Sequence, residues 1–569
     1  MPAVVVFVAV IAIFALAYRF YSTYLAEKVY ALDPDFVTPA HEFEDGVDYV
    51  PTNRHVLFGH HFTSIAGAAP IVGPAIAVVW GWLPALLWIV AGTVFAAGVH
   101  DTGSLVVSVR NKATNIGTLA QDVINPRSRT LFLAIIFFLL TLVNAVFAIV
   151  IGTLFVGNPE AVIPITLEIP LAIFIGQYIR RTNSSALVPS IAGVIVLYAM
   201  ILVGMAYPID ITGIAEGLGM SARTLWILLL FIYGWIASRI PVWVLLQPRD
   251  YINSHQLFIA LGVIFLGVLI GMDTIAAPAF NSVGGARNWF PFLFVTIACG
   301  AVSGFHSLVS SGTTSKQLDK DTDARYIGYM GSLGEGSLAL GAVLATTAGI
   351  GIVGLNWGEQ YADFGTASET ALGNFVQGVA GFASNIGIPI SYGTVFAAVV
   401  VISFAATTLD TGIRLQRYII QEIGEIVDSR TLSQNLNLAT TLAVVFPLGL
   451  ALAPAGGDGD TLAFGRLWTL FGTTNQLTAG LALAVIAVWV TRNGRNAMAQ
   501  IVPLTFLLFM TCWALFINLR EFVANRDWLL APLDLAIFVL AGWLIVEAVL
   551  AIRGARADRT APVESPAEK

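Results

Sequence analysis

Histidine is the side chain whose ordinary pKa lies nearest physiological pH, so it is the first candidate for proton chemistry. Five of the seven histidines lie in or beside two glycine-rich and serine-rich segments or at the end of an apolar run: His55, His60, His61, His100 and His306. This grouping indicates that a proton is bound and passed on. Two alternatives are a neutral His60/His61 pair that hydrogen-bonds to backbone carbonyls and a zinc site. No cysteine or carboxylate stands at ligand spacing, which disfavours zinc.

Three carboxylates interrupt apolar stretches and extend this set. Asp101 follows His100, Glu335 lies in GSLGEGSLALG, and Asp410 lies in ATTLDTGIR. Glu335 has glycine and serine neighbours and no nearby basic residue, so burial would favour its protonated form. The alternative is an ordinary carboxylate at a helix end. Asp410 precedes Arg414 by four residues, a spacing that equally predicts a structural salt bridge.

Neutral polar side chains form two further groups. Thr407, Thr408 and Thr411 surround Asp410, and hydroxyl oxygens suit a hard cation such as sodium. Sodium therefore stays an alternative to the proton as coupling ion. Inside another apolar run stand four consecutive polar residues, Thr473, Thr474, Asn475 and Gln476. Such a run is costly at membrane depth unless it lines a wet cavity, with helix packing as the alternative.

The elements that position these residues are apolar helices. Hydrophobic residues make up 57% of the 569 residues and charged residues 11%, against about 25% in soluble domains. Runs of about 20 apolar residues recur, each long enough to cross a hydrocarbon core. They predict an all-α polytopic membrane protein with about fifteen transmembrane helices. The predicted spans are 3–22, 62–79, 82–100, 130–155, 163–178, 186–206, 223–246, 255–272, 290–310, 331–353, 388–412, 436–453, 467–491, 499–518 and 531–551.

We expect one transmembrane domain over residues 1–553 and a disordered cytoplasmic tail over 554–569. Basic residues recur in every second loop, which predicts an outside N-terminus and a cytoplasmic C-terminus in a bacterial inner membrane. These residues are Arg110, Lys112, Arg127, Arg129, Arg180, Arg181, Arg249, Lys316, Lys320, Arg325, Arg414, Arg417, Arg492, Arg495, Arg553, Arg556 and Arg559.

Two segments differ from lipid-facing helices because they combine glycine, serine or threonine with histidine. They are FGHHFTSIAGAAPIVGPAIAVVWG, from Phe58 to Gly81, and CGAVSGFHSLVSSGTTSKQ, from Cys299 to Gln317. They open the second and ninth predicted spans, so they run in opposite directions. This spacing is typical of an inverted repeat, here about 58–272 and 290–551. The alternative is that small residues only allow close helix packing.

We expect residues 67–73 and 303–312 to be non-helical or kinked and to approach each other near the membrane midplane. The N-termini of half-helices would offer N–H donors to a small carboxylate. The candidate substrate-binding residues are His60, His61, Thr63, Ser64, Gly67, Pro70, Gly73, Ser303, His306, Ser307, Ser310, Ser311, Thr473, Thr474, Asn475 and Gln476. The candidate coupling-ion residues are His61, Asp101, Glu335, Thr407, Thr408, Asp410 and Thr411.

The block from Asp45 to Asp101, which contains FGHHFTSIAGAAPIVGPAIAVVWG, resembles the carbon starvation (CstA) family of bacterial inner-membrane transporters. The shorter segments 299–318, 406–422 and 466–483 resemble it too, and the resemblance extends to about Leu519. It implies membership of the amino-acid/polyamine/organocation superfamily, with a leucine-transporter-like core of two inverted repeats and broken helices. It also implies secondary active uptake of pyruvate or peptides driven by protons.

Other function classes are less well supported by the residues. A sodium-coupled symporter of the same substrates, a channel and a metabolite-binding membrane sensor are the alternatives. A channel would favour repeated pore rings, and a sensor would favour a soluble output domain. An enzyme is disfavoured because no nucleophile with a base and no HExxH motif is visible. We expect a small-molecule substrate, a proton or sodium ion and membrane lipid as partners, and no cofactor, structural metal or nucleic acid.

Overall fold

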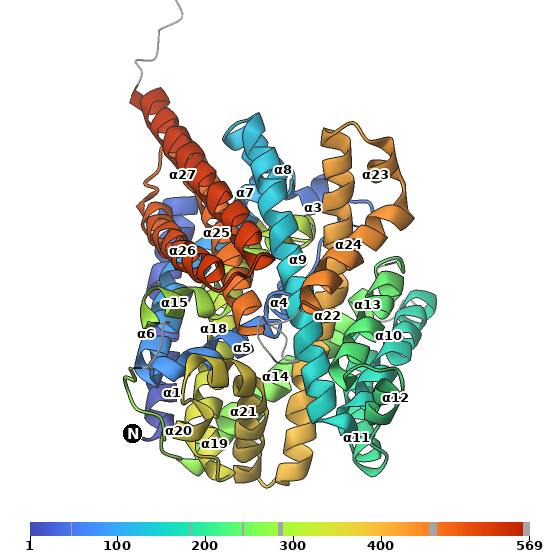
Figure 1. Ribbon diagram of the computed structural model, residues 1–569. Coiled ribbons are helices and arrows are strands. Elements are labelled where there is room, and N and C mark those ends of the chain that lie inside the picture. Colours follow the sequence, from blue (N-terminus) through green and yellow to red (C-terminus); the bar gives the residue numbers. More distant parts are fainter. Residues whose placement is uncertain (47, 183–184, 242–243, 283–287, 454–463, 561–569) are drawn as a thin grey trace, which may run out of the picture.

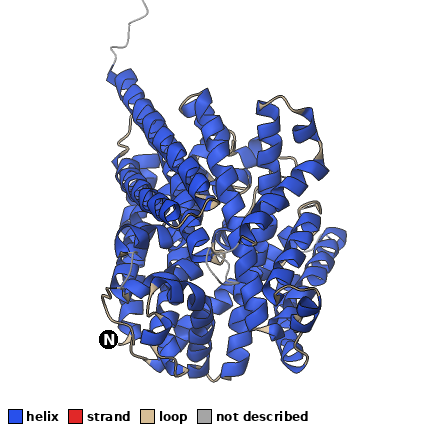
Figure 2. Cartoon of the chain, in the orientation of Figure 1, coloured by secondary structure: helices blue, strands red, loops and turns tan. Residues whose placement is uncertain are grey.

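The computed structural model describes residues 1–46, 48–182, 185–241, 244–282, 288–453 and 464–560, and within them it forms helices and no strand (Figure 2). The helices of eight or more residues are α1 (Ala3–Leu16), α4 (Arg54–Ile65), α5 (Ala69–Ala77), α6 (Trp82–Gly92), α7 (Gly98–Arg110), α8 (Ile116–Val123), α9 (Pro126–Gly157), α10 (Val162–Thr182), α11 (Leu187–Ala206), α13 (Ala222–Ala237), α14 (Leu246–Gly271), α15 (Trp289–Thr296), α17 (Phe305–Gly312), α18 (Met330–Leu344), α21 (Phe364–Asn385), α22 (Ile390–Ile426), α24 (Leu436–Ala451), α25 (Phe464–Arg492), α26 (Met498–Ala524) and α27 (Leu530–Thr560). Shorter helices are α2 (Ser22–Tyr24), α3 (Pro39–Glu42), α12 (Thr212–Gly217), α16 (Ala298–Ala301), α19 (Ile350–Ile352), α20 (Trp357–Gln360) and α23 (Arg430–Gln434).

Eleven helices of the described chain are long and apolar enough to cross a membrane, and the bent pair of α4 and α5 raises this number to twelve. The all-α polytopic fold is therefore confirmed. The count of about fifteen is not. The predicted spans 223–246 and 436–453 coincide with α13 and α24, which have 16 residues each. At 1.5 Å per residue such helices reach about 24 Å, short of a hydrocarbon core of about 30 Å. A further predicted span, 290–310, is divided among α15, α16 and α17.

Both small-residue segments are broken, as the sequence predicts, although the breaks start earlier than expected. α4 ends at Ile65 and α5 begins at Ala69, with a bend of 50° between them. In the second segment α16 ends at Ala301 and α17 begins at Phe305. Gly73 and most of the 303–312 range are therefore helical. Pro70 explains the first shift, because a proline in the first turn begins a helix instead of ending one.

Glycine allows the two broken helices to pack backbone against backbone. A Cβ added to Gly73 would clash with the carbonyl oxygen of Thr296, and a Cβ on Gly300 would lie 3.0 Å from Pro74 Cγ. α5 packs against α16, and α4 packs against α17. Helices that flank the first break therefore pack against helices that flank the second, and the expected position near the membrane midplane stays a prediction.

Two long helices run through the molecule and hold the rest together. α9 packs against α8, α13, α22 and α25, while α22 packs against α9, α14, α21 and α24 (Figure 1). In chain order, α9 comes after the first broken helix, the long stretch Trp82–Arg110 and α8, and α22 comes after the second broken helix, the long stretch Asp321–Ile352 and α21. The first break lies between these two helices, since a Cβ on Gly67 would lie 2.8 Å from Thr408 Oγ1 on α22 and 3.7 Å from the Phe147 ring on α9.

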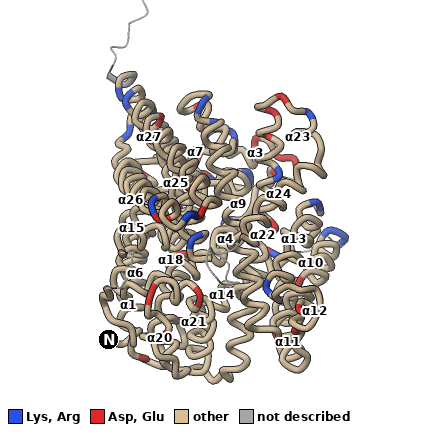
Figure 3. Tube along the Cα trace, in the orientation of Figure 1, with Lys and Arg blue, Asp and Glu red and all other residues tan. Residues whose placement is uncertain are grey.

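The C-terminal helix α27 continues to Thr560 and projects from the body of the molecule (Figure 1). Residues 554–560 of the expected disordered tail are therefore helical, and residues 561–569 lie outside the described part of the chain. Lys and Arg are concentrated toward the end of the molecule where α27, α7 and α23 finish, away from the N-terminus and α20 (Figure 3). This distribution favours a cytoplasmic location for that end.

Cysteine accessibility tests this orientation. We expect a membrane-impermeant maleimide to label Lys112→Cys and Arg553→Cys only after the cytoplasmic side is opened, and Ala362→Cys in intact cells. All three positions are exposed, and Ala362 leaves the Asp363 cap of α21 intact. Cys512→Ser removes the half-buried native thiol from the background. Labelling of position 553 in intact cells would contradict the orientation.

Candidate functional site

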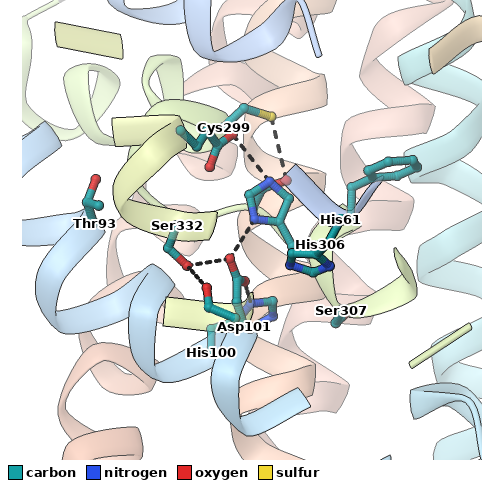
Figure 4. Close-up of polar contacts among 12 residues, drawn as sticks. His61, Thr93, His100, Asp101, Cys299, His306, Ser307 and Ser332 are labelled. Atoms are coloured by element: carbon teal, nitrogen blue, oxygen red, sulfur yellow. Dashed lines mark hydrogen bonds and ion pairs between the residues drawn. The ribbon is translucent and has the colours of Figure 1, made fainter. Parts of the chain in front are cut away.

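Asp101 is the centre of a fully buried polar cluster. It lies on α7, and its Oδ1 is 2.7 Å from His100 Nδ1. Its Oδ2 is 2.9 Å from His306 Nδ1 and accepts a hydrogen bond of 2.7 Å from Ser332 Oγ. Figure 4 shows these three side chains converging on the Asp101 carboxylate. Three donors stabilise the ionised carboxylate, which offsets the cost of removing it from water.

His306 connects Asp101 to Glu335. Its other ring nitrogen, Nε2, lies 3.2 Å from Glu335 Oε1, although the two atoms are not aligned as a hydrogen bond. A neutral imidazole has one N–H, so it cannot donate to both carboxylates. If Nδ1 donates to Asp101, the contact of Nε2 with Glu335 is favourable when either the ring or Glu335 carries an additional proton, which makes this pair a candidate proton-binding site. The sequence showed no cation near Glu335 because His306 comes from another helix.

His60 and His61 face different neighbours, as expected for adjacent residues about 100° apart on a helix. His61 is fully buried, and its Nδ1 lies 2.9 Å from Thr314 Oγ1. Its ring borders α18, since a Cβ on Gly331 would lie 3.1 Å from it. His60 Nδ1 instead lies 3.8 Å from Asp250 Oδ2 on α14. His61 thus borders the Asp101 cluster, whereas His306 is the histidine that joins it.

The four polar residues of α25, 473–476, are fully buried, and two of them hydrogen-bond to the second broken helix. Asn475 Oδ1 accepts hydrogen bonds from the Phe305 N–H at 3.1 Å and from Ser303 Oγ at 3.3 Å. Gln476 donates to the Phe294 carbonyl at 2.6 Å and accepts from Thr511. Asn475 therefore occupies the N-terminus of α17, so a substrate carboxylate at this end would have to displace its amide. Thr473 and Thr474 both donate to the Leu470 carbonyl.

Most of the other predicted substrate-binding side chains with a hydroxyl group donate a hydrogen bond to a nearby backbone carbonyl. Thr63, Ser64, Ser307 and Ser311 donate to carbonyls three or four residues earlier. Ser310 differs, because its hydroxyl is buried and has no hydrogen-bond partner among the described residues. Pro70 and Gly73 lie in α5, and Gly67 lies in the break before it. Ser310 is therefore the hydroxyl of this set that is free to bind a ligand.

A second buried cluster surrounds Arg249. Its Nε donates to Glu168 Oε1 at 3.0 Å, and its Nη1 donates to Asp410 Oδ2 at 2.8 Å. Tyr233 also donates to Asp410 Oδ2. The sequence placed Arg249 in a loop, but α14 begins at Leu246 and the Arg249 side chain is 1% exposed. Glu168, a lone carboxylate within an apolar run, was the signal that could have found this cluster.

The predicted Asp410–Arg414 salt bridge is wrong. Arg414 donates to the carbonyls of Ala237 and Ile240. The spacing of four residues allowed the pair, but buried Arg249 offers Asp410 a closer and better shielded cation. Asp410 therefore holds α14 and α22 together.

The three threonines near Asp410 do not converge on one point. Thr407 accepts a hydrogen bond from Asn253 at 2.6 Å and donates to the Ser403 carbonyl. Thr408 lies against the first break, since a Cβ on Gly67 would lie 2.8 Å from its Oγ1. Thr411 is half-buried. Thr408 is thus the one member of the set placed beside the break of α4 and α5.

Taken together, these features define a polytopic α-helical membrane protein in which two broken helices meet beside buried ionisable clusters. The family model described as Carbon starvation protein CstA matches residues 2–353 and 356–514. The chain belongs to this family.

Relatives cover most of the chain. The Peptide transporter CstA of Escherichia coli (strain K12) is 34% identical and matches 89% of this chain and 80% of its own length. The Pyruvate/proton symporter BtsT of the same organism is 32% identical over 91% of this chain and 81% of its own length. The Peptide transporter CstA of Bacillus subtilis (strain 168) is 31% identical, with 97% and 94% covered. A crystal structure of a mutant of the Eremococcus coleocola manganese transporter aligns with a TM-score of 0.47 at 11% identity, covering 90% of this chain and 99% of that chain.

The Asp101 cluster predicts a stability effect. Asp101→Asn removes the charge that faces two histidines, and breaking a buried ion pair typically costs about 3 kcal/mol. We expect the variant to have a lower melting temperature in detergent, measured by tryptophan fluorescence. Asp122→Asn, at an exposed carboxylate on α8, is the matched control and should melt as the wild type does. Equal melting of all three proteins would contradict a stabilising role for the cluster.

Proposed function

We propose that this chain is a secondary active transporter of the bacterial inner membrane that imports a small carboxylate metabolite such as pyruvate, or peptides, by proton symport. The observation that carries the proposal is the placement of His306 between Asp101 and Glu335. These residues lie on three helices, α7, α17 and α18. Relative movement of the helices changes the distances among the residues, and with them the affinity for the shared proton.

The neighbours of the long helices support an inverted repeat. α9 has α8, α13 and α25 beside it, and α22 has α21, α24 and α14. If the broken helices are equivalent, then α8 corresponds to α21, α13 to α24, and α14 to α25. The repeats would then run from α4 to α14 and from α15 to α25, with α10 and α11 inserted and with α26 and α27 outside. A repeat of this kind places the site between two units that rock against each other.

Two kinds of observation support the substrate class: the names of the relatives and the chemistry of the buried side chains. The relatives are named for peptide transport and for pyruvate/proton symport. Ser303 and Asn475 beside the second break, and Ser310 in the last turn of α17, are neutral, small and buried. Such a lining suits a small molecule better than a long peptide. Ser310 and the N-terminus of α17 are the groups we assign to a substrate carboxylate.

Sodium symport is the second candidate, and a specific observation favours it. The Thr408 hydroxyl lies against Gly67, where the helix break frees backbone carbonyl oxygens. Hydroxyl and carbonyl oxygens are suitable ligands for a hard cation. In this alternative the cation binds between α22 and the break, and the Asp101 cluster is structural.

Transport by reconstituted protein separates the two candidates. We expect labelled pyruvate or dialanine to accumulate in proteoliposomes under an imposed pH gradient without sodium. His306→Gln and Glu335→Gln remove the shared titratable proton, so they should abolish accumulation and leave downhill exchange intact. His41→Gln, at an exposed histidine, is the control and should accumulate normally.

The Thr408→Ala variant tests sodium coupling directly. If protons drive uptake, Thr408→Ala keeps pH-driven accumulation within about twofold of wild type, because the hydroxyl binds no coupling ion. Accumulation that requires sodium and that Thr408→Ala abolishes would replace the proton mechanism with the sodium mechanism. Accumulation under neither gradient would contradict both.

A further inference from the structure

A buried carboxylate outside the Asp101 cluster lacks the partners that a charge at membrane depth requires. Asp250 lies on α14 and is 6% exposed. Its Oδ1 has no hydrogen-bond partner among the described residues, and its Oδ2 lies 3.8 Å from His60 Nδ1. An ionised carboxylate left in this state is strongly disfavoured, and binding a proton removes the charge.

Arg249, the preceding residue in the chain, is engaged by two other carboxylates. Its guanidinium is turned toward Glu168 and Asp410, with contacts of 3.0 and 2.8 Å. One positive charge therefore already faces two carboxylates, and a third negative charge would be unbalanced. The charged and titratable side chains around Asp250 are His60 on α4, Glu168 on α10, Tyr233 on α13, Arg249 and Tyr251 on α14, and Asp410 on α22.

His60 is more exposed than Asp250. The side chain of His60 is 20% exposed, whereas that of Asp250 is 7% exposed. His60 also belongs to α4, one half of the first broken helix, while Asp250 belongs to α14. A movement of α4 relative to α14 would open or close the 3.8 Å contact and alter the proton affinity of the carboxyl group.

We propose that Asp250, reached through His60, is a second proton-binding site, separate from the Asp101–His306–Glu335 cluster, so that two protons move with each substrate. The proposal rests on the transport function proposed above. His61 lies toward the first cluster and His60 toward the second, so α4 borders both proton sites. Rearrangement of this one half-helix would then act on both protons in the same step.

The number of protons carried with each substrate molecule tests the second site. With the membrane potential clamped at zero, two coupled protons raise the steady-state accumulation ratio about 100-fold per pH unit, and one proton raises it about tenfold. We expect wild-type proteoliposomes loaded with labelled pyruvate or dialanine to show the 100-fold dependence and Asp250→Asn to show the tenfold dependence. Asp534→Asn, at a buried carboxylate of α27 outside both clusters, should keep the 100-fold dependence.

The outcomes separate the two proposals. No pH dependence in the wild type would overturn the proposed proton symport itself. A tenfold dependence in the wild type, or the same 100-fold dependence in Asp250→Asn, would overturn the second site alone. A tenfold wild-type slope overturns the second site even where Asp250→Asn does not fold.

Infrared difference spectroscopy gives a readout that needs no transport. The proposal expects a C=O band of a protonated carboxyl group in the wild type that is lost in Asp250→Asn and changes with pH. His60→Gln should keep this band but slow the initial rate of pH-driven uptake about tenfold or more, since it removes the titratable group on the route. Absence of an Asp250-dependent band at every pH would overturn the second site.

Discussion

The need to stabilise buried carboxylates dictates how this structure is assembled. Ionised groups at membrane depth are costly, so each must find donors within the bundle. Asp101 obtains them from its own helix α7, from α17 and from α18. His306 is the second residue of α17, and it reaches Asp101 because the chain is non-helical between Ala301 and Phe305. The break in the second broken helix is therefore what brings His306 into the buried cluster.

The Arg249 cluster stabilises buried carboxylates in the same way in another part of the bundle. Arg249 joins α10, α14 and α22, which are far apart in the sequence, through Glu168 and Asp410. Between the two clusters lies α4, with His61 facing one and His60 facing the other. The non-helical residues 66–68 separate α4 from α5, so α4 is not held in line with the rest of its span. The half-helix that contacts both clusters is thus separated from the rest of its span by a break in the helical backbone.

The sequence predicted the individual polar residues better than their partners. His100, Asp101, His306 and Glu335 stand out because polar groups inside apolar runs are rare, and the structure brings these four together. Arg249 was missed because it lies near the start of an apolar run, where a basic residue is normally a loop residue. Its partners come from other helices, and no spacing along one chain reveals such a contact. The same limit made Arg414 a false partner for Asp410, since helical spacing shows only which pairs are possible.

The amides of α25 explain how the broken helix stays ordered without substrate. Asn475 accepts from the first N–H of α17, while Gln476 donates to the Phe294 carbonyl in α15. Adjacent residues of one continuous helix therefore satisfy backbone groups on either side of α16. Gly304 permits this close approach, because a Cβ there would clash with the Asn475 carbonyl. A carboxylate that takes the place of the Asn475 amide would remove one of the contacts between α17 and α25. Because α17 also carries His306, this contact links the second break to the Asp101 cluster through a single short helix.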